Sequence, residues 1–314
     1  MIINKTLTIL ILTTLLASCK GQNNEAIKMD TVNKYDKNID KRAYYLNYDL
    51  FMTYDIYLND IKIISNYQSG PVSGLGYLNE YILNSGKQTI RLVDKDLFPG
   101  ETNIPKDIFQ KFNMEIYTAD ENDENIQNIK KLDFPIIDTP NPYVFEKTWT
   151  FDATVPFDIE GWKKGQDLTK IDNEELEKMV VDKFEHYRKL LDNGQVDQFM
   201  EENKKNFEEF VIANYYQKRW SEYNDNIRET IGNQKGKMLP LENYKMKIYG
   251  NGKLVTLERI DINPVFYGRS ALVGVWKEKN KLYSDYILLY MPKGKNTLEP
   301  IRAAIDYDIY DTSK

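Results

Sequence analysis

The hydrophobic pattern of this chain changes its period twice, which narrows the folds open to it more than any other feature. Between Arg42 and Phe157, apolar and β-branched residues form short runs separated by turn residues, and no run has the spacing of an amphipathic helix. From Asp172 apolar residues recur at intervals of three and four, and after Gly232 the interval becomes two. Helical side chains repeat every 3.6 residues and strand side chains every two. The sequence therefore predicts strands, then helices, then strands again.

The first strand-rich part, residues 42–160, is predicted to be an all-β sandwich. Two strands, Asp49–Leu58 and Ile61–Ile64, are separated by Asn59-Asp60, a pair typical of a two-residue hairpin turn. A long loop is predicted after them, because Gly and Pro are frequent at residues 70–76. Further strands are predicted near residues 87–93, 112–118 and 144–153. Many short strands without helices are typical of sandwiches.

The second part, residues 161–314, is predicted to be an α+β domain in which helices precede an antiparallel meander. Residues 161–170 contain Gly, Lys and Asp and are expected to link the two domains. Asp172 is a good N-cap, with Glu175 at the third helical position, and Asn193-Gly194 ends that helix. A second helical stretch follows at residues 196–231, with a break near 203–206. Two hairpins come after it: residues 244–249 pair with 253–260, and residues 270–278 pair with 282–291.

Both parts resemble known folds. Tyr57-Leu58-Asn59-Asp60, Leu78-Asn79-Glu80-Tyr81-Ile82 and Gly86-Lys87-Gln88-Thr89-Ile90 look like segments of the accessory jelly-roll sandwiches of some glycoside hydrolases. Asp60 stands where those domains usually have Gly, and Gln88 where they have Asn. This resemblance implies sugar binding. The order of elements after residue 161 resembles cystatin-like and NTF2-like folds, in which a curved sheet wraps one or more helices.

The N-terminus has the three-part pattern of a secretory signal. Lys5 precedes a mainly apolar run from Leu7 to Leu16, which is too short for a transmembrane helix of roughly 20 apolar residues. Leu16-Ala17-Ser18-Cys19 resembles the bacterial lipobox, which implies cleavage before Cys19 and acylation of its thiol by chains such as palmitate. Residues 1–18 are then a lipoprotein signal peptide and residues 19–41 a flexible tether. Cys19 is the only cysteine, so the exported chain has no internal disulfide.

Location and charge limit the partners. Lys20 replaces the aspartate that retains enteric lipoproteins in the inner membrane, which favours the outer membrane. Cys19-Lys20-Gly21-Gln22 resembles lipoprotein starts in Bacteroidetes, but the first acid is Glu25, so the periplasmic and external faces both stay open. Without the signal, which carries one Lys and no acid, the net charge falls from −6 to −7. An acidic chain without basic clusters argues against nucleic acid; the expected membrane attachment is the lipid anchor.

Catalytic motifs are scarce, and no cofactor or metal site is predicted. His186 is the only histidine, so a zinc site of His and Cys has too few ligands. The sequence contains no nucleophile elbow, P-loop or dinucleotide fingerprint. The acidic run at residues 120–125 lacks the spacing of a calcium loop and reads as a solvated turn. A pair of carboxylates acting as acid and base stays open.

The aromatic residues Tyr216, Trp220 and Tyr223 are the candidate binding residues. They are four and three positions apart, so the pattern places them on one helix face. They either pack beneath the curved sheet or line its open end, where Tyr and Trp contact ligands and proteins well.

These features together indicate a non-enzymatic, membrane-tethered lipoprotein that serves as a binding module in the cell envelope. Its partner is expected to be a protein or an envelope component, and one specific version is an immunity-type lipoprotein that neutralises a toxin. The alternatives are glycan or small-molecule binding through the β-sandwich, and a carboxylate-based enzyme in the second domain.

Overall fold

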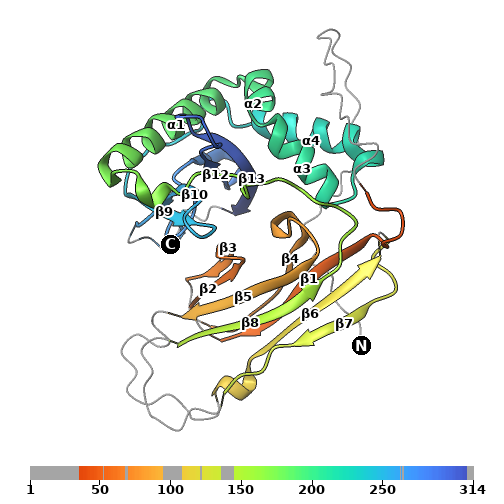
Figure 1. Cartoon of the computed structure of the whole chain (residues 1–314). Coiled ribbons are helices and arrows are strands. Elements are labelled where there is room, and N and C mark those ends of the chain that lie inside the picture. Colours follow the sequence, from red (N-terminus) through yellow and green to blue (C-terminus); the bar gives the residue numbers. More distant parts are fainter. Residues whose placement is uncertain are drawn as a thin grey trace.

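The computed structural model describes residues 35–309, apart from positions 52, 68–69, 95–107, 121, 136–144, 262 and 264. This part of the chain folds into three antiparallel sheets and four α-helices, and its N-terminal half is rich in strands (Figure 1). We call residues 35–153 the N-terminal half and residues 172–309 the C-terminal half. The prediction of a strand-rich part followed by mixed helices and strands is confirmed at this level.

Two four-stranded sheets form the N-terminal half. The first has the order β4-β1-β6-β7 and the second the order β3-β2-β5-β8. Apolar side chains of both sheets gather in one core, which includes Leu46, Ile56, Ile90 and Ile116. The eight strands are β1 Arg42–Leu50, β2 Tyr54–Leu58, β3 Ile61–Asn66, β4 Val72–Tyr77, β5 Gly86–Asp94, β6 Asn113–Asp120, β7 Gln127–Lys131 and β8 Phe145–Ala153.

Three local predictions can be compared with these strands. The Asn59-Asp60 turn is confirmed, and both residues have the positive φ of such turns, 51° and 65°. The single strand at residues 49–58 is wrong, because β1 and β2 belong to different sheets. The loop at residues 70–76 is also wrong, because strand β4 occupies most of it. Gly74 is there for close packing, since a Cβ atom would collide with the Tyr48 hydroxyl.

The first long helix begins and ends at its predicted caps. The Asp172 carboxylate accepts hydrogen bonds from the backbone N–H groups of Glu174 and Glu175, and Gly194 ends the helix with φ 66°. The break at Asn203 is confirmed, whereas a second break at residues 214–219 was not predicted. The α-helices are α1 Asn173–Asn193, α2 Val196–Glu202, α3 Lys204–Ala213 and α4 Trp220–Gly232; the 3₁₀ helices are η1 Asn79–Tyr81, η2 Ile108–Lys111, η3 Leu168–Lys170, η4 Gln217–Arg219 and η5 Lys277–Lys279.

The third sheet contains both predicted C-terminal hairpins and one further strand. Its strands are β9 Tyr244–Tyr249, β10 Leu254–Arg259, β11 Val273–Trp276, β12 Lys281–Tyr290 and β13 Glu299–Ile309. A simple meander is wrong, because β10 pairs with β12 and β13 pairs along the whole of β12. Strand β13 escaped prediction because Pro300 and alternating acids hide its apolar pattern.

The third sheet lies between the helices and the two N-terminal sheets (Figure 1). Val255, Leu257 and Ile287 face the helices and form one core with them. Leu254 and Leu288 point the other way and join the core of the N-terminal half. The boundary between two domains at residues 160–161 stays a prediction, since the core of the N-terminal half includes residues on both sides of it.

The N-terminal segment joins the fold before Arg42. The Tyr35 hydroxyl donates to the carbonyl of Ile212 at 2.8 Å, and the N–H of Asp36 donates to the carbonyl of Pro156 at 2.7 Å. Residues 35–41 therefore contact the C-terminal half and the segment that connects the halves, although the sequence assigns them to the flexible tether. The signal peptide, Cys19 and the tether up to residue 34 lie outside the described residues. Within the described ranges, no helix is long and apolar enough to cross a membrane.

Candidate functional site

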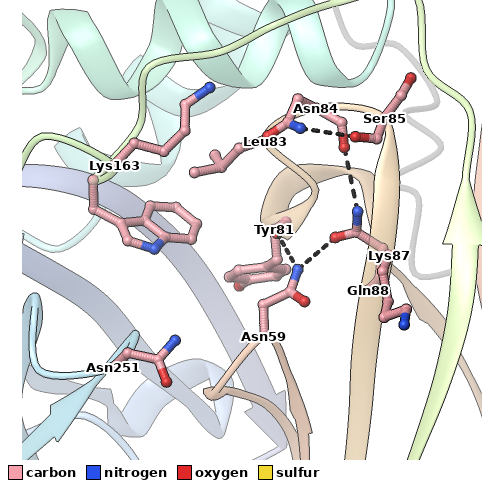
Figure 2. Close-up of a pocket in the computed structure, with 10 residues that line it drawn as sticks. Asn59, Tyr81, Leu83, Asn84, Ser85, Lys87, Gln88, Lys163 and Asn251 are labelled. Carbon is pink, nitrogen blue, oxygen red and sulfur yellow. Dashed lines mark hydrogen bonds between the residues drawn. The ribbon is translucent and has the colours of Figure 1, made fainter.

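A pocket of about 270 Å³ lies where the two halves meet (Figure 2). Its walls come from the β2–β3 turn, the segment from η1 to β5, the β9–β10 turn and residues 154–171, which join the two halves and which we call the connecting segment. The lining residues are mostly polar: Asn59, Tyr81, Leu83, Asn84, Ser85, Lys87, Gln88, Trp162, Lys163 and Asn251.

Direct bonds between the two hairpin turns form one side of the pocket. The backbone carbonyl of Asp60 accepts from the N–H of Gly250 at 3.1 Å, and its carboxylate accepts from the N–H of Asn251 at 2.8 Å. Both turns were predicted from sequence, but their contact was not. Because the bonds use backbone groups of short turns, the two halves hold a fixed distance here.

Asn59 and Gln88 shape the pocket and have little capacity left for a ligand. The Asn59 amide donates to the carbonyl of Tyr81 at 3.2 Å and to the Gln88 side-chain oxygen at 2.7 Å (Figure 2). Its own oxygen accepts from the N–H of Thr89, and the Gln88 amide donates to the carbonyls of Asn84 and Gly86. These bonds hold the segment before β5 against the β2–β3 turn.

Lys87 and Asn251 are the groups best placed to meet a ligand. Both are exposed, and within the described part of the chain their side chains make no hydrogen bond or ion pair. The Asn84 amide nitrogen donates to the carbonyl of Ser85, and its side-chain oxygen accepts no hydrogen bond from the described residues. The pocket thus offers an ammonium group, a complete amide and an amide oxygen.

Trp162 is a core residue, 6% exposed, whose edge lines the pocket and which is held from behind. The Arg302 guanidinium lies 5.0 Å from the Trp162 ring centre, a cation–π distance. The preceding residue, Gly161, donates its N–H to Glu209 at 3.0 Å. Gly161 has φ 52°, and a Cβ there would collide with Leu83, so only glycine fits without strain.

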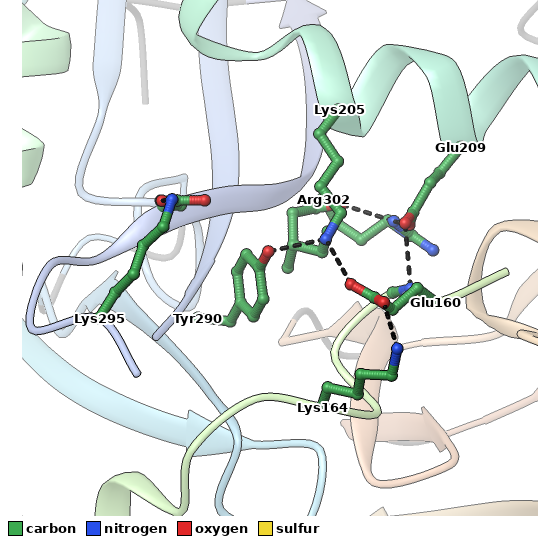
Figure 3. A network of polar contacts seen from close by, with 10 residues as sticks. Glu160, Lys164, Lys205, Glu209, Tyr290, Lys295 and Arg302 are labelled. Carbon is green, nitrogen blue, oxygen red and sulfur yellow. Dashed lines mark hydrogen bonds and ion pairs between the residues drawn. The ribbon is translucent and has the colours of Figure 1, made fainter. Parts of the chain in front are cut away.

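A network of charges behind Trp162 fixes the connecting segment (Figure 3). Arg302 on β13 pairs with Glu209 on α3 at 2.7 Å, and both side chains are buried. Glu160 pairs with Lys164 at 3.0 Å and with Lys205 at 3.2 Å, and these hydrogen bonds lower the pKa of its carboxyl. The segment predicted as a linker is therefore bonded to the C-terminal half.

The three aromatic candidates lie close together but not on one helix face. Tyr216 precedes η4, and only Trp220 and Tyr223 belong to α4, so the predicted shared face is wrong. The physical reason is the break after α3, which separates Tyr216 from the helix. Trp220 is 6% exposed and packs in the helix core, whereas Tyr216 and Tyr223 are half-buried, with ring centres 5.7 Å apart. Their role in binding stays a prediction.

The other titratable candidates have structural partners. His186 Nε2 lies 2.7 Å from Glu202, which also pairs with Lys183. In the acidic run, Asp120 accepts from the backbone N–H groups of Asn122 and Glu124, as expected for a closed turn. No three His, Cys, Asp or Glu side chains come together as a metal site among the described residues.

Two buried carboxyls of the C-terminal half lie on opposite faces of the third sheet. Asp285 faces the helices and accepts from the Gln234 amide at 2.9 Å. Glu258 faces the N-terminal half and accepts from the hydroxyls of Tyr249 and Tyr286. They are separated by the sheet, so they do not form an acid–base pair.

No known protein family, curated protein or solved structure matches this chain. The sequence did not predict this pocket, and none of the three aromatic candidates lines it. The segments that resemble jelly-roll sandwiches contribute Asn59, Tyr81 and Lys87. Trp162 and Asn251 come from parts of the chain without such a pattern and were missed.

Proposed function

We propose that this protein is a lipid-anchored, non-enzymatic binding module of the cell envelope that holds a saccharide in the pocket between its halves. In this proposal the N-terminal half is a β-sandwich and the C-terminal half a cystatin-like or NTF2-like domain. Acylated Cys19 anchors the chain in the outer membrane, on the periplasmic or the external face.

The observation that carries the saccharide assignment is the set of unpaired polar groups that converge on one pocket with an aromatic residue in its lining. A sugar presents hydroxyls that both donate and accept, and these match the Asn251 amide, the Asn84 oxygen and the Lys87 ammonium. Trp162 also lines the pocket, but it is only 6% exposed, so it adds a small apolar area beside these polar groups. Sites that bind small molecules combine apolar surface with a few convergent polar groups in this way.

The pocket volume favours a small part of a ligand. At about 270 Å³ it lies just below the range of roughly 300–1,000 Å³ that is usual for drug-sized molecules. A single sugar unit, with the rest of a glycan outside, is the occupant that this volume supports.

The test compares two asparagines in equivalent turns. Asn251 and Asn280 are both exposed and both have positive φ, 55° and 49°, so replacement by glycine keeps either backbone unstrained. We expect calorimetry with peptidoglycan fragments and envelope oligosaccharides to detect binding that Asn251→Gly weakens about tenfold, because one bidentate amide contact is lost. Asn280→Gly should bind as the unmodified protein does. Equal loss in both variants, or no binding to any oligosaccharide, would contradict the assignment.

The anchor is tested separately. Cys19→Ser should abolish labelling with a fatty-acid probe and leave an uncleaved or misplaced precursor, because the acylated thiol is gone. Labelling that persists in this variant would rule out lipidation at Cys19.

A further inference from the structure

Basic side chains gather around Trp276, which ends strand β11 at the edge of the third sheet. The ammonium of Lys237 lies 4.4 Å from the centre of the indole ring, and that of Lys279 lies 4.0 Å from it. Aromatic rings attract cations at these distances. The two ammonium groups are therefore at most 8.4 Å apart, the sum of the two distances.

Backbone bonds fix the position of Lys237 beside β11. The N–H of Val275 donates to the carbonyl of Lys237 at 2.9 Å, and the N–H of Leu239 donates to the carbonyl of Val273 at 2.8 Å. The Lys237 ammonium also donates to the carbonyl of Lys235 at 3.2 Å. The segment after α4 thus runs alongside β11 and brings its lysines to the indole.

Three further lysines extend this group. Lys281 lies directly opposite Trp276 in the pairing of β11 with β12, so their side chains share one face of the sheet. Lys235 and Lys277 are exposed, and their side chains make no hydrogen bond or ion pair with the described residues. We define the Trp276 patch as Trp276 with Lys235, Lys237, Lys277, Lys279 and Lys281.

The Trp276 patch is opposite in sign to the chain as a whole, which has a net charge of −6. Residues 235–239 and 276–281 contain five lysines and one acid, Glu278. The nearby carboxylate of Asp192 accepts from the backbone N–H of Met238 at 3.1 Å. Positive charge is therefore in excess here, and like charges held this close repel one another unless an anion from outside joins them. The sequence shows no basic cluster, because the two segments meet only in the folded chain.

We infer that the Trp276 patch binds the anionic headgroups of the membrane in which the chain is anchored, and so decides which side of the fold lies against the bilayer. Lysines beside a tryptophan are typical of surfaces at the headgroup level, where anionic lipids attract the lysines. The choice of a membrane rests on the proposed anchor at Cys19. The sixteen residues from Cys19 to Tyr35 span at most roughly 55 Å, so an anchored chain keeps its fold within reach of the bilayer.

The first experiment measures partitioning onto vesicles of phosphatidylcholine with and without phosphatidylglycerol. It uses the whole chain with Cys19→Ser, so that no acyl group contributes, and the apolar run at residues 7–16 is common to all variants. We expect phosphatidylglycerol to raise partitioning at low salt, and added salt to reverse the gain. Lys277→Gln combined with Lys279→Gln should lower partitioning onto the anionic vesicles about tenfold, since each lysine near such a surface contributes a few-fold.

The matched control is Lys131→Gln combined with Lys178→Gln. These two lysines lie on β7 and α1, are exposed, and make no side-chain hydrogen bond or ion pair with the described residues. The control changes the net charge equally and should lower partitioning little. Trp276→Leu removes the ring that holds two ammonium groups together and should weaken partitioning severalfold, with circular dichroism unchanged.

Amine labelling on the same vesicles provides an independent readout. Lys277 and Lys279 should lose reactivity when phosphatidylglycerol is present, whereas Lys131 and Lys178 should keep it. Equal partitioning onto both kinds of vesicle, equal losses in the patch and control variants, or equal protection of all four lysines would overturn the inference.

Two competitors separate a membrane from other anions. Inorganic phosphate and polyglutamate should displace the protein from anionic vesicles only at concentrations that act as added salt. Displacement at lower concentrations would assign the patch to a free anion or to an acidic protein, and would also overturn the inference. The anchor is judged separately, by fatty-acid labelling of unmodified Cys19, because the vesicle experiment uses a chain that cannot be acylated there.

Discussion

The two faces of the third sheet are built on different principles. The face toward the helices is almost entirely apolar, and Asp285 is an isolated carboxyl within it. The face toward the N-terminal half carries a polar cluster, in which Lys62 pairs with Glu258 at 2.7 Å and both side chains are 5% exposed. Tyr249 and Tyr286 both donate to the same Glu258 oxygen.

This difference shows how the two interfaces obtain their specificity. Apolar packing tolerates several arrangements of similar volume, whereas a buried ion pair with hydrogen bonds fits only one. The helix face therefore stabilises the fold through burial, and the polar face fixes how the halves meet. The position of the halves in turn sets the shape of the pocket.

The largest effect is expected from breaking the polar face. Lys62→Met should lower the free energy of unfolding by about 3–5 kcal/mol, because Glu258 is left as a buried charge without its cation. Denaturant unfolding measures this loss. The control is Lys147→Met, which breaks a pair of similar length, 2.9 Å, with Asp133 81% exposed, and it should cost at most about 1 kcal/mol. Similar costs for both variants would mean that the polar cluster contributes little.

The next effect tests the apolar face. Trp220→Ala should lower the free energy of unfolding by about 3 kcal/mol, because a buried indole leaves a cavity beside Phe207. Thermal denaturation provides the measurement, with the half-buried Trp276→Ala as the less destabilised control. A stable Trp220→Ala protein would restore this residue as a binding candidate and weaken the description of the face as a core.

The isolated carboxyl of the apolar face predicts a pH effect. Burial raises the pKa of Asp285 to about 7, against a smaller lowering by the Gln234 hydrogen bond. The folded state therefore favours the neutral acid, whose contribution to stability is complete below pH of about 4 and is lost as the pH rises through 7.

Asp285→Asn should remove this pH-dependent loss. Its stability relative to the unmodified protein should rise from near zero at pH 4 to about 4 kcal/mol at pH 8, since a shift of about three pKa units corresponds to that difference, as measured by urea unfolding at both pH values. Asp182→Asn, on the exposed side of α1, is the control and should show no such difference. A relative stability that is the same at both pH values would show that folding does not raise the pKa of Asp285.

The smallest effect concerns a local feature that belongs to neither face. Asp172→Ala should cost about 1 kcal/mol, because two N–H groups at the start of α1 lose their acceptor. Asp182→Ala in the middle of α1 should change the melting temperature little. A larger cost for Asp172→Ala than for Trp220→Ala would reverse the order that burial predicts.

The sequence by itself determined those features whose cause lies within a few residues. Asp172 and Gly194 bound α1 because a side-chain oxygen caps one end and glycine adopts positive φ at the other. Asn59-Asp60 and Gly250-Asn251-Gly252 form the expected turns for the same local reason. Periodicity failed where local chemistry misleads: packed glycines in β4 resemble a loop, and the break before η4 interrupts the expected aromatic face.

Tertiary structure alone decided the pocket and the polar cluster. The bond between Asp60 and Asn251 joins positions 191 residues apart, and the Arg302–Glu209 pair that supports Trp162 joins positions 93 apart. Nothing near any of these residues specifies its partner, because a side chain has the same chemistry in a solvated turn and in a buried interface. What differs is the desolvation and the fixed distance that only the assembled halves impose, and these make a few ordinary polar residues into candidate sites.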